Sequence, residues 1–415
     1  MSSYLRSSLA ELSVLPYPNG VRLVVKRQTG RPMAAARVTL AGGGDSEALA
    51  LYLAALGGGP SPAGLGPELD EQGATLGMDL DSTGDAAISL AAPAEALGGL
   101  LAAIGRNLLS PVFRQADFAT ATAALREARR VEAADPGRRS AGLLRDEMEG
   151  RRAAAFPAPG IQAIREAWLL SFSPERLSVV VVGDLEAASL ASSLASGFGA
   201  MTRGATEAGT ATRPSPGFQT LRLAQAQSSD AGRLSLRAEP RTPAIASRDY
   251  AALAVALTML DGLLGPGTRT ALPGPLTSRP SILIEAAASP RDAMAELDAA
   301  ATLIASGYCG SPQGREAGAV PIGAALEAYR SRTLARLYAG SAAGPELAAR
   351  IALGLETAGD AGAFFRAADA LASLSPEDVS RAARVYLGED GLAWLALGDP
   401  RLIKALEALG FTETP

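Results

Sequence analysis

The side chains that could carry out chemistry are few in this chain of 415 residues. Histidine is absent, and cysteine occurs once, as Cys309. Ser-His-Asp and Cys-His catalysis, and every zinc site that needs an imidazole, are therefore excluded. One cysteine also excludes an intrachain disulfide framework and a cysteine-rich metal centre. What remains for catalysis is carboxylates, hydroxyls, arginines and two lysines, Lys26 and Lys404.

Asp79 and Asp81 are one candidate for an acid/base pair. Residues two apart lie on the same face of a strand, so the two carboxylates would point the same way. A hydrolase with its own carboxylate pair is one hypothesis that they permit. A solvated hairpin explains them more simply, because nothing else in the sequence marks them.

The charge balance argues against several kinds of partner. The chain has 38 Lys+Arg against 43 Asp+Glu, a net charge of −5 and no basic block, which is a poor match to a nucleic-acid backbone. Residues 1–15 lack the continuous apolar run of a signal peptide, and no apolar stretch is long enough to span a bilayer. We therefore expect a cytoplasmic protein that binds neither nucleic acid nor membrane.

The elements that must position the polar side chains follow a mixed pattern. Runs rich in β-branched and apolar residues predict strands at 20–26, 36–40, 86–90, 179–182, 233–237, 281–285 and 392–397. Helical periodicity predicts helices at 46–56, 95–109, 118–133, 140–155, 250–264, 293–306, 324–337, 345–355, 362–372 and 377–387. Ser375-Pro376-Glu377-Asp378 predicts a capping box at the start of the last helix.

Two halves of the chain end alike. Leu177–Asp184 aligns without gaps on Leu392–Asp399, and in each case a buried strand ends in Gly-Asp before a short helix. Asp184 is expected to cap the helix 185–194. Residues 201–217 are poor in large apolar residues and predict a linker. The repeat predicts two related domains, 1–200 and 218–415.

In their order and spacing these pieces resemble the pitrilysin-type zinc peptidase superfamily, which contains mitochondrial processing peptidase and insulin-degrading enzyme. The similar segments are Pro18–Val25, Leu69–Ala74, Ala86–Leu90, Ala96–Phe113 and Glu175–Asp184. The resemblance implies an α+β fold of two tandem homologous domains, each a mainly antiparallel sheet covered by helices.

The catalytic motif of that family is replaced here. The family carries an inverted H-x-x-E-H motif on its first helix, with two zinc-binding histidines and a general-base glutamate. Leu51 and Ala55 align with the histidines, and Ala54 aligns with the glutamate. A distal glutamate ligand would fall at Glu127 or Glu132, which cannot hold zinc alone and are explained by a solvated helix face. The resemblance therefore implies no metal site, no catalytic residue and no peptidase activity in the isolated chain.

The second half of the family often carries an arginine and a tyrosine, seven residues apart, that help to position substrate. The matching stretch here has no such pair, but it keeps Gly265, Gly267, Arg269 and Arg279. The guanidinium groups could hold carbonyl or carboxylate oxygens of a peptide, and the glycines would allow close approach. The alternative is an ordinary surface loop with two arginines.

The leading hypothesis is a non-catalytic subunit that pairs with a homologous, zinc-bearing peptidase subunit. The two chains would close around a peptide substrate, with zinc in the partner and no cofactor in this chain. The alternative is a stand-alone structural or peptide-binding protein of the same fold, for which the family offers a precedent in core subunits of a respiratory complex.

Overall fold

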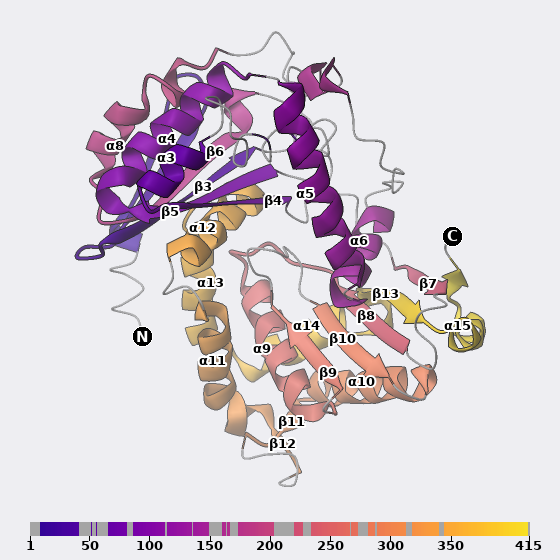
Figure 1. Cartoon of the computed structure of the whole chain (residues 1–415). Helices are drawn as coiled ribbons and strands as arrows, with labels where there is room; N and C mark the ends of the chain where they lie inside the picture. The colour runs from indigo at the N-terminus through magenta and orange to yellow at the C-terminus, as the bar shows by residue number, and fades with distance from the viewer. Residues whose placement is uncertain are drawn as a thin grey trace. The chain divides into compact units, whose positions relative to one another are not determined.

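A computed structural model shows a mixed α+β chain that divides into two compact units (Figure 1). Unit 1 contains residues 1–130, 155–213 and 340–365, and unit 2 contains residues 131–154, 214–339 and 366–415. Each unit therefore includes one segment from the opposite half of the sequence. The structure describes residues 9–40, 51, 55, 65–80, 86–112, 114–134, 136–148, 160–162, 164–166, 173–202, 220–226, 234–265, 267–272, 281–286, 289–312, 318–339 and 344–413.

Unit 1 is built on a six-stranded sheet with the order β1-β2-β6-β3-β5-β4. The strands are β1 (Leu12–Pro16), β2 (Arg22–Arg27), β3 (Met33–Leu40), β4 (Thr75–Leu80), β5 (Ala86–Pro93) and β6 (Leu177–Gly183). Only the β2–β6 pair is parallel. Alternate strand residues form one apolar face that packs on α3 (Gly66–Glu71), α4 (Ala94–Leu109) and α8 (Ala187–Leu194). Unit 1 thus has the mainly antiparallel, helix-covered sheet that the family resemblance implies.

The second face of this sheet is covered by a helix from the C-terminal half of the chain. Helix α12 (Gly344–Ala358) packs on β3, β5 and β6, and Figure 1 shows this gold ribbon beside the indigo and purple strands. The approach is close, because a Cβ on Gly344 would lie 3.0 Å from Cβ of Ala35. A glycine at this position lets the helix start against the strand.

Unit 2 repeats the arrangement with the strand order β14-β7-β13-β8-β10-β9. The strands are β7 (Arg222–Ala226), β8 (Leu234–Pro240), β9 (Thr268–Ala271), β10 (Ser281–Ala286), β13 (Leu392–Gly398) and β14 (Thr412–Glu413). Five strands correspond to those of unit 1 in order and direction, including the parallel pair β7–β13. The outermost strand differs, since β14 runs parallel to β7 whereas β1 runs antiparallel to β2.

Helices cover the second sheet as well. The unit includes α9 (Arg248–Leu263), α10 (Pro290–Ala305), α11 (Ile322–Tyr338), α14 (Pro376–Tyr386), α15 (Pro400–Leu406) and a β11–β12 hairpin (Tyr308–Gly310, Ala319–Pro321). Helix α6 (Pro136–Met148), from the N-terminal half, packs on β8 and β13. Its Leu144 is fully buried in an apolar cluster with Leu223, Leu395 and Leu397. Helices α5 (Gln115–Ala134) and α13 (Ala363–Ala372) complete the longer elements.

Each sheet buries an arginine at the same place. Arg37 lies opposite Val180, and Arg237 lies opposite Leu395, which is the residue that aligns with Val180 in the repeat. Arg237 pairs with Glu239 of its own strand at 2.8 Å, and both side chains are buried. A buried charge is tolerated only when it is paired, so the Arg237–Glu239 pair satisfies a requirement of the fold.

Of the two helix caps that the sequence predicts, one is confirmed and one is wrong. The capping box at Ser375 and Asp378 is confirmed, with both reciprocal hydrogen bonds present. The cap predicted at Asp184 is wrong: Asp184 accepts from the N–H of Gly30 and from Arg27, and Glu186 caps α8 instead. The helix 46–56 lies outside the described residues except at 51 and 55. Among the described residues, no helix is long and apolar enough to cross a membrane.

A pH-dependent contribution to stability is expected at Asp378. Hydrogen bonds from Arg248 (2.6 and 3.0 Å), followed by those of Ser375, lower the pKa of Asp378 to about 2. A carboxylate whose pKa is lower in the folded state stabilises fully above its unfolded pKa, near 3.9, and loses that contribution as the pH falls through about 2. Because Arg248 is half exposed and water screens the pair, the contribution is about 1 kcal/mol.

Urea unfolding between pH 6 and 2 measures this contribution. Asp378→Asn is expected to lower the free energy of unfolding at pH 6 and to flatten its fall below pH 4. Asp298→Asn removes an exposed carboxylate on α10 and is the control. Equal pH curves for wild type and Asp378→Asn would contradict the assignment.

Candidate functional site

The two positions that align with zinc-binding histidines lie in the apolar core of unit 1. Leu51 is 1% exposed and Ala55 is 8% exposed, and both belong to the cluster that α4 and the sheet bury. Neither side chain has a lone pair to offer a metal, so these residues do not fit zinc. Ala54, at the general-base position, lies outside the described residues.

Of the two candidate distal glutamates, the structure describes the side chain of Glu127. Glu127 lies on the exposed side of α5, and Arg130 donates to both of its carboxylate oxygens at 2.8 and 2.9 Å. The hydrogen bond from Arg130 lowers the pKa of Glu127. The side chain of Glu132 lies outside the described set. Across the described part of the chain, no group of three or more Cys, Asp or Glu side chains could hold a metal ion. Glu127 is thus the solvated helix residue that the sequence suggested.

The predicted peptide-binding loop is partly described. Gly265 donates its N–H to Glu296 of α10 at 3.2 Å, and Gly267 is exposed. Arg269 lies on β9 with its side chain in solvent. Arg279 falls outside the described residues. The structure therefore leaves Arg269 accessible to a ligand and ties the start of the loop to α10.

The outer edge of β9 is closed by side chains that the sequence did not single out. The N–H of Thr270 donates to Asp261 of α9 at 3.0 Å, and its carbonyl oxygen accepts from Arg336 of α11. The N–H of Thr268 donates to the carbonyl oxygen of Gly265 at 3.0 Å. An added peptide strand needs such main-chain groups, so these residues of β9 are not available to one.

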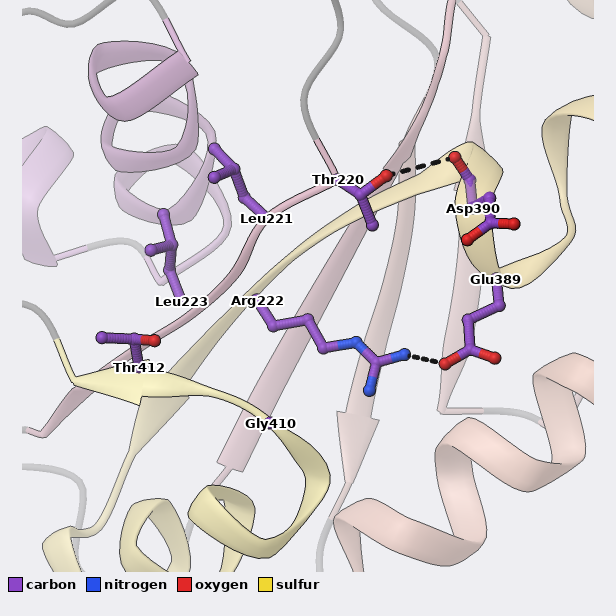
Figure 2. Close-up of a pocket in the computed structure, with 8 residues that line it drawn as sticks. All are labelled: Thr220, Leu221, Arg222, Leu223, Glu389, Asp390, Gly410 and Thr412. Carbon is purple, nitrogen blue, oxygen red and sulfur yellow. Dashed lines mark hydrogen bonds and ion pairs between the residues drawn. The ribbon is translucent and has the colours of Figure 1, made fainter.

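A hollow of about 400 Å³ lies at the opposite edge of the unit 2 sheet (Figure 2). It is lined by Thr220, Leu221, Arg222, Leu223, Glu389, Asp390, Gly410 and Thr412. Arg222 points across it and donates to Glu389 and to the carbonyl oxygen of Leu409. Figure 2 shows Leu221 and Leu223 pointing to the other side of the strand, toward α6. The hollow thus presents the charged groups of Arg222, Glu389 and Asp390 beside apolar surface of similar extent, and sequence patterns did not indicate it.

Comparison with known proteins gives a likeness of fold. No protein-family model matches the chain, and no curated protein matches its sequence. A protease from Helicobacter pylori matches with a TM-score of 0.71 and 14% identity, over 93% of this chain and 99% of that one. The inactive domain of a peptidase M16 from Pseudomonas fluorescens matches with a TM-score of 0.67 and 14% identity. The match covers 94% of this chain and 98% of that one.

A third similar structure is the first half of the periplasmic protease PqqL from Escherichia coli, with a TM-score of 0.65 and 11% identity over 95% of this chain and 93% of that one. Against the whole of PqqL, the match covers 94% of this chain but 45% of that chain. At these identities the likeness concerns the fold, and roles of residues do not transfer with it.

Proposed function

We propose, on the premise that this chain has the fold of pitrilysin-type (M16) peptidases, that it is a non-catalytic subunit of a two-chain zinc peptidase. It would form one wall of a peptide-degrading chamber, and a homologous, zinc-bearing subunit would form the other. The observation that carries this proposal is the burial of Leu51 and Ala55 in the core, where the fold would otherwise place zinc ligands.

The extent of the structural match supports the pairing. The chain accounts for almost the whole of the inactive domain from Pseudomonas fluorescens and for about half of PqqL. A chain that corresponds to half of a longer protease leaves room for a second half supplied by another polypeptide. The peptide substrate would then be oriented between two walls. Positioning of the peptide and exclusion of water would increase the rate of hydrolysis.

The two units of the chain fit a gene duplication. Their sheets share the order and direction of five strands, and each buries an arginine at the same register. This supports the proposal of two tandem homologous domains joined near residues 201–217. It also refines that proposal, because each unit takes one helix from the other half of the sequence.

Capture of partners from the native host tests the proposal. A tagged chain is expected to retain a homologue that carries H-x-x-E-H, and peptide hydrolysis by the mixture is expected to exceed hydrolysis by that homologue alone. Recovery of the chain without such a homologue would favour the stand-alone structural or peptide-binding protein. Fractionation of the same cells tests the expected cytoplasmic location.

A role for Arg269 in holding substrate is testable in the reconstituted pair. Its exposed guanidinium could donate to peptide oxygens, and loss of one such hydrogen bond is worth about 1 kcal/mol. Arg269→Ala is expected to raise KM about fivefold with little change in kcat. Arg291→Ala, which removes an exposed arginine of α10, is the control. An unchanged KM would assign Arg269 to an ordinary surface strand.

A further inference from the structure

The β7 edge of the unit 2 sheet is only partly covered by its neighbour. In unit 1 the corresponding strand β2 pairs with β1 along all five residues of Leu12–Pro16. In unit 2, the described residues of β14, Thr412 and Glu413, pair with Leu223 and Ala224 of β7. The start of this edge, Thr220 to Arg222, lies ahead of the first pair and coincides with the hollow of Figure 2.

The direction of the main-chain groups follows from the pairing on the other side. The N–H of Trp394 on β13 donates to the carbonyl oxygen of Leu221 at 2.7 Å, so the groups of Leu221 face β13. Main-chain groups of neighbouring residues in a strand face opposite sides. Thr220 and Arg222 therefore direct main-chain groups toward the side on which β14 runs. The parallel pairing of Thr412 with Leu223 uses the carbonyl oxygen of Arg222, so an extended segment would pair with the N–H and carbonyl of Thr220 and with the N–H of Arg222.

The charges around the hollow indicate what such a segment should carry. Glu389 and Asp390 stand at one rim, on the turn before β13, and both are exposed. The one cation among the lining residues, Arg222, already donates to Glu389 and Leu409. The surplus charge of the lining is thus negative and is best matched by an ammonium or guanidinium group.

We propose that this hollow binds an extended peptide segment that pairs with the β7 edge and places a lysine or arginine side chain against Glu389 and Asp390. Strand addition supplies affinity through the main chain, and the carboxylates supply preference for a basic residue. At the β9 edge, Asp261, Arg336 and Gly265 already hold Thr270 and Thr268, so that edge offers no equivalent place.

Fluorescence anisotropy on the full chain tests the proposal with two short, end-blocked peptides that differ only in a central lysine or norleucine. The lysine peptide is expected to bind about fivefold more tightly. Asp390→Asn is expected to weaken the lysine peptide about threefold and to leave the norleucine peptide unchanged. Asp298→Asn, which removes an exposed carboxylate elsewhere in the unit, is expected to affect neither.

Amide hydrogen exchange gives an independent readout. Binding of the lysine peptide is expected to slow exchange at Thr220 and Arg222 and to leave β9 unchanged. Equal affinity for the two peptides, or binding without protection of these amides, would overturn the proposal. All measurements use the isolated chain, so failure to find a zinc-bearing partner leaves this inference intact.

Discussion

Cutting the chain between residues 203 and 219 is expected to leave the two fragments tightly associated. The N-terminal fragment carries α6, which belongs to unit 2, and the C-terminal fragment carries α12, which belongs to unit 1. Neither unit can be completed by one fragment. A protease site inserted in this segment and cleaved after folding should give fragments that co-elute in size exclusion and separate only in denaturant.

Each fragment made alone is expected not to fold stably. Without α6, the C-terminal fragment exposes Leu223, Leu395 and Leu397, which now bury against Leu144. Burial of such a side chain contributes about 1.5–3 kcal/mol, so the loss approaches the whole stability of a typical domain, about 5–15 kcal/mol.

Two substitutions test whether the buried face of α6 holds the cleaved fragments together. Leu144→Asp is expected to release the fragments, whereas Leu109→Asp, at a position that is 36% exposed, is expected to leave them associated. A soluble N-terminal fragment that melts cooperatively by itself would contradict the exchange of helices.

Placing histidines at positions 51 and 55, which align with the family's zinc ligands, is expected to unfold the protein without creating a zinc site. Leu51 and Ala55 are buried among apolar side chains, and truncation of a buried leucine to alanine alone costs about 2–5 kcal/mol. An imidazole adds the cost of burying a polar group without a hydrogen-bond partner, about 1–3 kcal/mol. Leu51→His with Ala55→His should therefore lower the free energy of unfolding by about 3 kcal/mol or more, which is at least the cost of truncating one buried leucine.

Thermal unfolding and metal analysis after dialysis measure the two parts of this expectation. Leu109→His, the same change at a partly exposed leucine, is expected to keep the wild-type melting temperature within a few degrees, about what surface substitutions cost. A double variant that stays folded and holds stoichiometric zinc would show that the pocket for the metal persists and that only its ligands were lost.

Much of the secondary structure and one chemical conclusion could be obtained from the sequence. Strands such as β6 and β13 are marked by a continuous apolar run, and helices such as α4 by apolar residues at helical spacing. Both patterns lie within one short segment of the chain. The capping box of α14 depends on Ser375 and Asp378, three residues apart. The absence of histidine excludes an imidazole zinc site in any conformation of the chain.

Short edge strands and capping choices were harder to predict. β1, β7 and β14 were not expected, because two to five residues at a sheet edge carry little pattern of their own. Asp184 has the right type and place to cap α8, but the nearby turn at Gly30 and the side chain of Arg27 take its oxygens. The choice between two partners depended on segments more than 150 residues apart.

Only the tertiary structure decided which sheet each exchanged helix covers. Apolar positions such as Leu144 indicate that α6 must bury one face, but they do not identify the face that receives it. The same is true of the β9 edge, where Asp261 and Arg336 meet Thr270 from two different helices. The sequence by itself determined the local elements and the absence of imidazole ligands, because these depend on residue type and short spacing. The exchanged helices, the closed edge of β9 and the hollow beside β7 are formed by residues far apart in the sequence. Which of these residues meet depends on how whole faces of helices and sheets fit together, and no short pattern records that.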